Sequence, residues 1–306
     1  MFSPKRTIRV LSFFPGLVIV AFFVIMFSVI PDILIPRIRQ SDGVWELVRN
    51  IVLSGLFVIC YILCIWSYLK CVFTHPGPVT ASYLHDYDEM YGSLRMRYCE
   101  VCGQKKPPRC HHCSVCKMCI VNMDHHCPWM CNCIGYQNKK FFVLFLFYSW
   151  VGSLLVLLLS VNMILPSLLG SDSRRSSIAF SPYVFISSVF AFSFAVTLLF
   201  FGGFHFWLVF NDQTTLETSF SFRSLFSNHR SYRKVPYYDN WCIVMDKNPW
   251  IWFLPVHDKK FCFSWGFMDD SDNSCDESLE EDSILVHEQL RTLKERMPLI
   301  AKNTRV

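Results

Sequence analysis

Charged side chains are scarce in this chain. Asp, Glu, Lys and Arg make up only 17% of its 306 residues, against about 25% in a typical soluble domain. Hydrophobic residues reach 52%, aromatic residues reach 16%, and the mean hydropathy is +0.30. This composition excludes a wholly disordered or fibrous chain and argues against two ordinary soluble domains, because too few charges are left to cover a surface in water. It favours a protein that lies in lipid.

A strong excess of one charge sign is also missing. The 29 Lys and Arg residues oppose 24 Asp and Glu residues, which gives a net charge of +5. This excess is too small to indicate nucleic-acid binding, and we expect no nucleic-acid partner, but it suits a protein that lies against anionic lipid.

Four apolar stretches are long enough to cross a bilayer, which takes about 20 helical residues. They cover residues 11–30, 51–73, 141–165 and 183–210. The first resembles a signal peptide, but it is too long for one and ends at Ile30-Pro31 without a small-residue cleavage site, so we expect an uncleaved helix. The sequence therefore predicts a mainly α-helical membrane protein with four transmembrane helices.

Basic residues set the expected orientation of these helices, because cytosolic loops carry an excess of Lys and Arg. The loop between the second and third helices holds most of them, so this loop and both termini are expected on the cytosolic side. Its basic residues, with those at the helix ends, are Lys70, Arg95, Arg97, Lys105, Lys106, Arg109, Lys117, Lys139 and Lys140. The compartment stays open between Golgi, endoplasmic reticulum and plasma membrane.

Nine of the fifteen cysteines lie between Cys99 and Cys133, inside this loop. The pattern C-x2-C-x9-H-x6-C occurs twice there, the second time displaced by fourteen residues. Three thiolates and one imidazole form the usual closed ligand set of structural zinc. The sequence thus predicts two structural zinc ions, one held by Cys99, Cys102, His112 and Cys119 and the other by Cys113, Cys116, His126 and Cys133.

One of the remaining cysteines, Cys127, follows the sequence Asp124-His125-His126. A thiolate nucleophile needs a neighbouring base, and that base needs a group to orient it. His125 is the candidate base and Asp124 its candidate partner, while a spare zinc ligand is the alternative role for Cys127. On spacing alone, a membrane-anchored zinc module that binds proteins, such as a ubiquitin-ligase-like adaptor, is as consistent with the pattern as an enzyme.

The run Asp124-His125-His126-Cys127-Pro128-Trp129, inside the double zinc pattern and between membrane helices, resembles the DHHC cysteine-rich-domain family of protein S-acyltransferases, or palmitoyltransferases. Thr214-Thr215-Leu216-Glu217 resembles the TTxE motif of that family, and Asn240 resembles its C-terminal asparagine. Two positions depart from the family pattern, namely His75 before Pro76-Gly77 and Cys131 two residues before the last zinc ligand. The further matching residues are Arg109, His112, Met123, Asn132, Gly135, Asn138 and Phe142.

The resemblance implies that Cys127 takes a fatty acyl group from acyl-CoA such as palmitoyl-CoA and passes it to cysteines of substrate proteins close to the membrane. It implies that His125 and Asp124 assist this transfer, with Thr214, Thr215 and Asn240 in support. Arg95, Lys139 and Lys140 are candidates for binding the CoA phosphates. Cys110 and Cys131 are expected to be bystanders or sites of acylation.

These features divide the chain into six segments: a cytosolic N-terminus (1–10), helices one and two (11–73), the zinc-binding catalytic domain (95–140), helices three and four (141–210), a cytosolic segment with the TTxE motif (211–265) and an acidic tail (266–306). The tail is expected to be disordered, apart from a candidate amphipathic helix over 284–300. His205, in the fourth helix, is interpreted as an interfacial residue or a helix–helix hydrogen bonder.

Overall fold

The computed structural model of the chain describes residues 19–39, 41, 43–81, 83–85, 96–168, 182–218 and 236–257. All of them lie in one structural unit, Met1–Gly266. The predictions for the N-terminal segment 1–10, for Arg95, and for the tail 266–306 with its helix fall outside the described residues.

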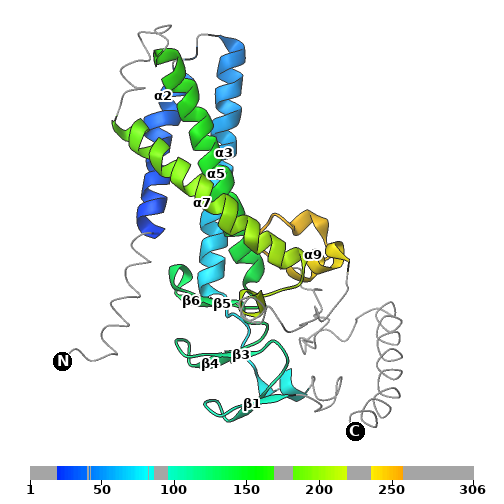
Figure 1. The fold of residues 1–306 in the computed structure, drawn as a ribbon. Helices are drawn as coiled ribbons and strands as arrows, with labels where there is room; N and C mark the ends of the chain where they lie inside the picture. Colours follow the sequence, from blue (N-terminus) through cyan, green and yellow to red (C-terminus); the bar gives the residue numbers. More distant parts are fainter. Residues whose placement is uncertain are drawn as a thin grey trace, which may run out of the picture. The chain divides into compact units, whose positions relative to one another are not determined.

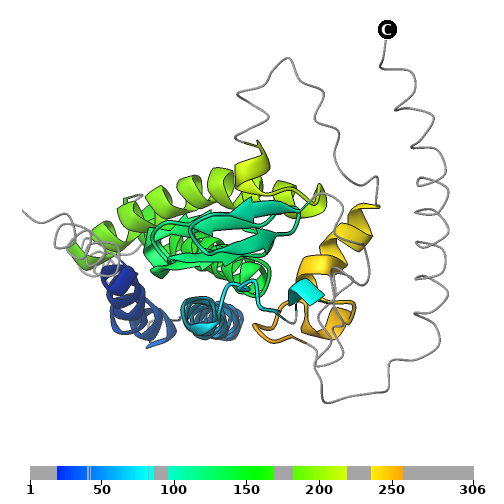
Figure 2. The same cartoon turned by 90° about the horizontal axis from the view of Figure 1, so that it is seen from below.

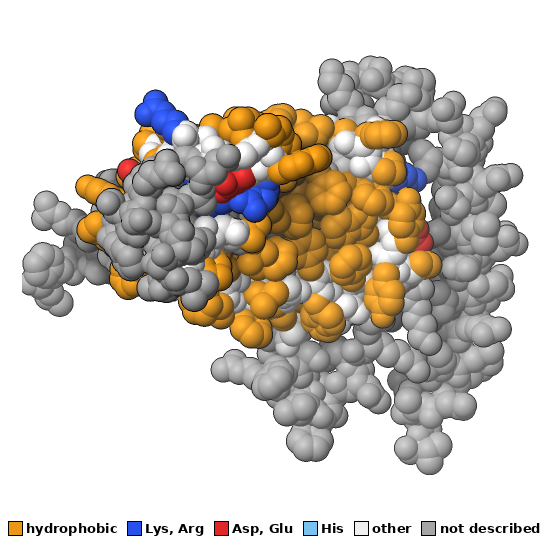
Figure 3. All heavy atoms as spheres, turned by 90° about the horizontal axis from the view of Figure 1, so that it is seen from above, with side chains coloured by type: hydrophobic (Ala, Val, Ile, Leu, Met, Phe, Trp, Pro, Cys, Tyr) orange, Lys and Arg blue, Asp and Glu red, His pale blue; other side chains and the backbone are white. Residues whose placement is uncertain are grey.

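Four helices are long and apolar enough to cross a membrane, which confirms the predicted four spans (Figure 1). They are Ile19–Arg39, α3 (Val44–Phe73), the first part of α5 (Lys139–Leu168) and α7 (Pro182–Phe210). Large apolar side chains also cover the outside of the described helices, and hydrophobic atoms dominate the face in Figure 3. Such a surface is unfavourable in water and is expected for helices in contact with lipid tails.

The first span does not end at Ile30-Pro31, and that part of the prediction is wrong. The chain forms a π-helical turn, η1 (Ile30–Leu34), and continues as α2 (Ile35–Arg39). Proline has no N–H and clashes with the carbonyl four residues back. A wider turn, closed by a hydrogen bond from Ile35 N–H to Ile30 O, lets the helix continue past Pro31.

Three short β-hairpins follow one another between α3 and α5. They pair β1 (Arg97–Cys99) with β2 (Gln104–Lys106), β3 (His111–Cys113) with β4 (Met118–Ile120), and β5 (His125–Cys127) with β6 (Asn132–Ile134), all antiparallel. Each hairpin begins fourteen residues after the previous one. The zinc-ligand repeat is thus part of a threefold structural repeat, of which the sequence analysis found two copies.

The turns of the hairpins repeat as well. Gly103, Lys117 and Cys131, again fourteen residues apart, all have positive φ, with values of 66°, 61° and 48°. In the first two turns the N–H of this residue donates to the carbonyl of the leading cysteine, Cys99 or Cys113, at 2.8 Å. The third turn differs because Pro128–Met130 forms a 3-10 helix, η2.

The third hairpin is attached to the end of α3 by two asparagine side chains. The amide of Asn132 donates to the carbonyls of Cys71, Val72 and Thr74 at 3.0–3.2 Å. These groups lack partners within the helix, because the last turn of a helix leaves its carbonyls free. The amide of Asn138 donates to Cys133 O at 2.8 Å and to Cys71 O at 3.3 Å. Figure 2, in which α3 is seen nearly end-on, shows the hairpins from below.

The segment after α7 folds back to the helix ends as α9 (Tyr237–Met245) and η3 (Pro249–Ile251). Asn240 donates from Nδ2 to Phe210 O at 2.8 Å and so satisfies a terminal carbonyl of α7. Asp246 is fully buried and forms an ion pair with the fully buried Lys140 at the start of α5. The described part of this segment, residues 236–257, is therefore folded against the ends of α5 and α7.

Gly135 tests how closely the third hairpin is packed. A Cβ atom at Gly135 would lie 2.4 Å from Pro76 O and 2.6 Å from a methyl group of Ile120, so the backbone has to move to accept one. Gly135→Ala is expected to destabilise the protein by about 1–3 kcal/mol, the usual cost of overpacking. Gly152→Ala in α5 is the matched control, since nothing lies within 4 Å of its Cβ. A lowered Tm in detergent for Gly135→Ala alone is the expected result, and equal Tm values for both variants would contradict it.

Candidate active site

Two clusters of four side chains confirm the predicted Cys3His groups. Each cluster is shared by two neighbouring hairpins. The first hairpin supplies the C-x2-C pair of the first cluster, and the second hairpin supplies its histidine and its last cysteine. The second hairpin also supplies the C-x2-C pair of the second cluster, whose histidine and last cysteine come from the third hairpin. In each cluster the four ligand atoms lie within 4.8 Å of one another. The members are Cys99, Cys102, His112 and Cys119 in the first cluster and Cys113, Cys116, His126 and Cys133 in the second. Both arrangements are consistent with metal binding.

The cysteines outside the clusters differ in their surroundings. None of the cysteines within the described residues forms a disulfide. Cys110 is completely buried, and this burial raises the pKa of its thiol to about 12, which makes it a poor nucleophile. Cys131 is exposed in the third turn. Cys127 is buried at the end of β5, within the apolar cluster that also contains Met130, Phe142 and Phe145.

Cys127 occupies the position in the third hairpin that Cys99 and Cys113 occupy in the first two. In those hairpins a second cysteine follows three residues later and completes the metal-binding pair. In the third hairpin this position is Met130, whose thioether is a weak ligand for zinc-type metals. Cys127 therefore has the strand position of a metal-binding cysteine but belongs to neither metal cluster. A spare-ligand role is not supported by this geometry.

His125 lies between Cys127 and Asp124. Its Nδ1 is 2.7 Å from Asp124 Oδ2, and its side chain also forms a hydrogen bond with the thiol of Cys127. Burial alone would lower the pKa of His125, but the hydrogen bonds with Asp124 and Cys127 and the negative charge of Asp124 raise it to about 9. The three side chains thus place a thiol, an imidazole and a carboxylate in sequence, an arrangement that is suited to covalent catalysis.

Asp124 is almost completely buried, with 1% of its side chain exposed. Burial raises the pKa of a carboxyl group, but here the charge of Lys139 and the hydrogen bonds from His125 and Thr215 hold the pKa of Asp124 well below its usual range. Lys139 Nζ lies 3.3 Å from Oδ1, and Thr215 donates from its hydroxyl to Oδ2 at 2.6 Å and from its N–H to Oδ1 at 3.2 Å. Asp124 is therefore held in its charged form.

The residues 214–217 contact the site through Thr215 and build their own turn through Thr214. Thr214 N–H donates to Glu217 Oε2 at 2.8 Å, and Glu217 N–H donates to Thr214 Oγ1 at 3.2 Å. This reciprocal pair is a capping box, which satisfies the free N–H groups at a helix start. The two threonines therefore have different roles: Thr214 caps the helix start, and Thr215 donates to the carboxylate of Asp124.

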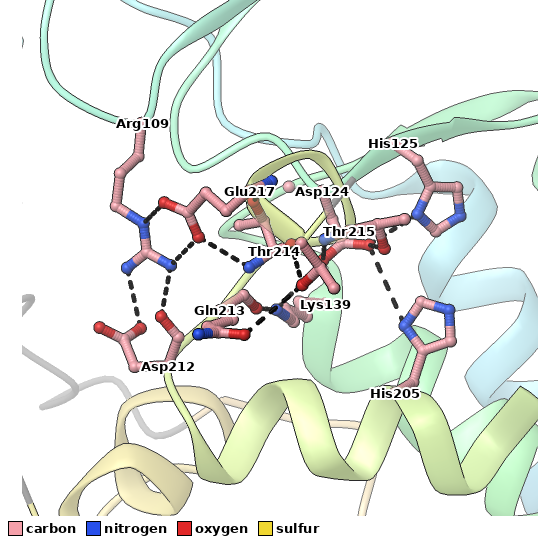
Figure 4. A network of polar contacts seen from close by, with 12 residues as sticks. Arg109, Asp124, His125, Lys139, His205, Asp212, Gln213, Thr214, Thr215 and Glu217 are labelled. Atoms are coloured by element: carbon pink, nitrogen blue, oxygen red, sulfur yellow. Dashed lines mark hydrogen bonds and ion pairs between the residues drawn. The ribbon is translucent and has the colours of Figure 1, made fainter. Parts of the chain in front are cut away.

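Arg109 joins the second hairpin to the same turn. Its guanidinium donates to both oxygens of Glu217, at 2.8 and 3.0 Å, and to the side chain and backbone oxygens of Asp212, at 2.8 and 2.7 Å (Figure 4). Planar, doubly hydrogen-bonded pairs of this kind fix geometry as well as charge. Arg109 thus ties the hairpins to the end of α7 close to the contact between Thr215 and Asp124.

The two lysines considered for phosphate binding have other partners. Lys139 is buried and donates to Asp124 and to Gln213 O, and Lys140 is buried with Asp246 and Val256 O. Neither ammonium group is offered to a phosphate at the surface, so the structure argues against this role for both. The sequence analysis missed the role of Lys139, since a lysine at the start of a span looks like an ordinary interfacial charge.

Comparison with known proteins places these residues in a family. A family model described as DHHC palmitoyltransferase matches residues 93–221. The chain is 33% identical over 280 residues to probable protein S-acyltransferase 12 of Arabidopsis thaliana, which covers 82% of this chain and 89% of that protein. It is also 33% identical over 242 residues to palmitoyltransferase ZDHHC15 of Homo sapiens, covering 68% of each chain.

Metal content tests the two clusters directly. Cys133→Ala removes a ligand of the second cluster, whereas Cys131→Ala, two residues away, removes an exposed thiol outside both clusters. The number of metal ions per chain, measured by elemental mass spectrometry, is expected to fall by at least one in Cys133→Ala and to stay unchanged in Cys131→Ala. The Tm should fall only with the metal, because coordination supplies much of the folding free energy of such small modules. Equal metal content in both variants would contradict the assignment.

Proposed function

Because the chain belongs to the DHHC palmitoyltransferase family, it is a protein S-acyltransferase, and we propose that Cys127 carries the acyl group during the reaction. The observation that supports this most strongly is the chain of contacts from Asp124 through His125 to Cys127. A zinc module that only binds proteins, the alternative, would give no role to the contacts among Asp124, His125 and Cys127.

The first half of the reaction forms an acyl-enzyme. His125 takes the proton of Cys127, and the thiolate attacks the carbonyl carbon of the fatty acyl-CoA thioester. A bond forms between the Cys127 sulfur and the acyl carbon, and the bond from that carbon to the CoA sulfur breaks. CoA leaves as a thiolate and receives the proton from His125. Asp124 fixes the ring of His125 and stabilises its charged form throughout.

The second half transfers the acyl group to the substrate protein. A cysteine thiol of that protein gives its proton to His125, and its sulfur attacks the acyl carbon on Cys127. The bond to Cys127 breaks, and Cys127 leaves as a thiolate that is again paired with His125. Both halves use the same base, as expected for a double-displacement reaction.

We infer that zinc fills both metal clusters and has a structural role. Zinc bonds of about 2.3 Å to sulfur and about 2.0 Å to nitrogen, at tetrahedral angles, place sulfur ligands about 3.8 Å apart and sulfur and nitrogen ligands about 3.5 Å apart. In the second cluster Cys116 Sγ lies 3.4 Å from Cys133 Sγ, and His126 Nδ1 lies 3.5 Å from each of them. These residues fit the ion, whose bonds would fix the backbone at His126, between His125 and Cys127, and at Cys133, which pairs with His126 across the hairpin.

The acyl chain is proposed to lie among the membrane helices. Cys127 belongs to the same buried apolar cluster as side chains of α5, including Phe142 and Phe145. Holding an acyl chain in water costs about 0.8 kcal/mol per CH2 group, so a site at the membrane face suits this substrate. We propose that this face, the hairpins and both termini are cytosolic, and that substrate cysteines lie near the membrane in Golgi, endoplasmic reticulum or plasma membrane.

The nucleophile is tested by intact-mass measurement after incubation with palmitoyl-CoA. The wild-type protein is expected to gain one acyl group that neutral hydroxylamine removes, and Cys127→Ser is expected to gain none that hydroxylamine removes. Cys131→Ser is the matched control and should acylate like the wild type. A hydroxylamine-sensitive adduct in Cys127→Ser at the wild-type level, with unchanged metal content, would exclude Cys127 as the acyl carrier.

The contact between Thr215 and Asp124 gives a second prediction. Thr215→Val keeps the shape of the side chain but removes the hydroxyl that donates to Asp124 Oδ2. A hydrogen bond to a charged group contributes about 1.5–3 kcal/mol, so the rate of acyl-enzyme formation should fall about tenfold or more. Thr215→Ser retains the hydroxyl and should stay close to the wild-type rate. Equal rates for the valine and serine variants would show that the hydroxyl has no part in the reaction.

A further inference from the structure

His205, in the last part of α7, has a buried ring nitrogen without a hydrogen-bond partner among the described residues. Only 2% of the residue is exposed, and its Nδ1 is completely buried. Buried polar atoms nearly always have partners in folded proteins, so an unpartnered nitrogen next to a reaction site calls for an explanation.

Aromatic rings hold His205 in place. The rings of Phe142, Phe201 and Phe204 meet it edge to face, with centroids 5.0, 4.7 and 5.6 Å away. The ring of His125 lies 5.6 Å from it on the side of the acyl-transfer site. Packing therefore sets the orientation of the His205 ring and fixes the direction in which its Nδ1 points.

That nitrogen faces Asp124. His205 Nδ1 lies 4.0 Å from Asp124 Oδ2, which is beyond hydrogen-bond distance (Figure 4). The same oxygen already accepts from His125 and Thr215. Facing a carboxylate, the favourable tautomer carries the proton on Nδ1, because a lone pair there would face negative charge. The Nδ1–H of His205 is thus about 1 Å too far from Asp124 Oδ2 for a hydrogen bond, and that oxygen already accepts two other hydrogen bonds in this state.

We propose that His205 is a positioning residue of the acyl-transfer site, and that its Nδ1–H donates to Asp124 Oδ2 when the hydrogen bond from His125 loosens during turnover. This inference rests on the proposed function. His125 has to serve two sulfur atoms in different places, first that of Cys127 and then that of the incoming thiol. Catalytic hydrogen bonds that are long in the free enzyme often tighten when substrate is bound. His205 would keep the buried carboxylate satisfied and in place while His125 shifts.

Three variants of His205 separate this role from simple packing. His205→Phe keeps an aromatic ring in the cage and removes both nitrogens. His205→Asn places an amide donor about where Nδ1 lies, and His205→Gln places one about where Nε2 lies. The rates of acyl-enzyme formation and of transfer to a substrate cysteine are measured against palmitoyl-CoA concentration in the full-length protein, with metal content and Tm recorded alongside.

The kcat of His205→Phe and His205→Gln is expected to fall about tenfold or more, the effect of losing one hydrogen bond to a charged group, with KM unchanged. His205→Asn should recover the rate to within about threefold. Three outcomes would each overturn the proposal. They are a wild-type rate in His205→Phe, an equal recovery of the rate in His205→Asn and His205→Gln, and a loss of rate that only follows a loss of Tm or of metal. A wild-type protein that forms no adduct dependent on Cys127 would instead refute the proposed function, independently of His205.

Discussion

The buried carboxylate of Asp124 is the interaction on which the rest of the site depends. It joins the third hairpin to the first residue of α5 and to the turn that follows α7, whose Thr215 lies 91 residues further along the chain. A charge with 1% exposure is very unfavourable unless it is paired and hydrogen-bonded. Lys139, His125 and Thr215 provide these partners, so the site can form only when the hairpins and the helix ends meet in one arrangement.

The hairpin repeat explains how a small segment with little apolar core brings Cys127 to that place. Each hairpin offers a leading cysteine in the same backbone position, and in two of the three a second cysteine lets it bind metal. The third hairpin has Met130 instead, and a helix rather than a fourth hairpin follows it. Its leading cysteine, Cys127, therefore occupies the strand position of a metal ligand but lies outside both clusters, and we propose that its thiol is kept for the reaction. Metal bonds to His126 and Cys133 would fix the backbone of the same hairpin on both strands.

Much of this architecture could be predicted from the sequence, because ligand spacing and apolar length are local properties of the chain. The two Cys3His clusters and the four spans were found in this way. The third copy of the repeat was also visible at the fourteen-residue shift, but it carries no second metal pair and was missed. The π-helical turn after Ile30 was not predicted, since proline usually marks the end of a helix.

Contacts between distant segments could not be predicted, since spacing alone does not show which of several equivalent side chains faces the site. The choice between Thr214 and Thr215, the pairing of Lys139 with Asp124 and the approach of His205 all depend on how α5 and α7 pack.

We propose that this packing makes Cys127, among the nine cysteines of the loop, the one that reacts. The decisive measurement is to map the acyl group by peptide mass spectrometry on the wild-type protein after brief incubation with palmitoyl-CoA. The thioester is expected on Cys127 with both metal clusters intact. A thioester on Cys131 or Cys110 beside an unmodified Cys127 would show that another cysteine carries the acyl group.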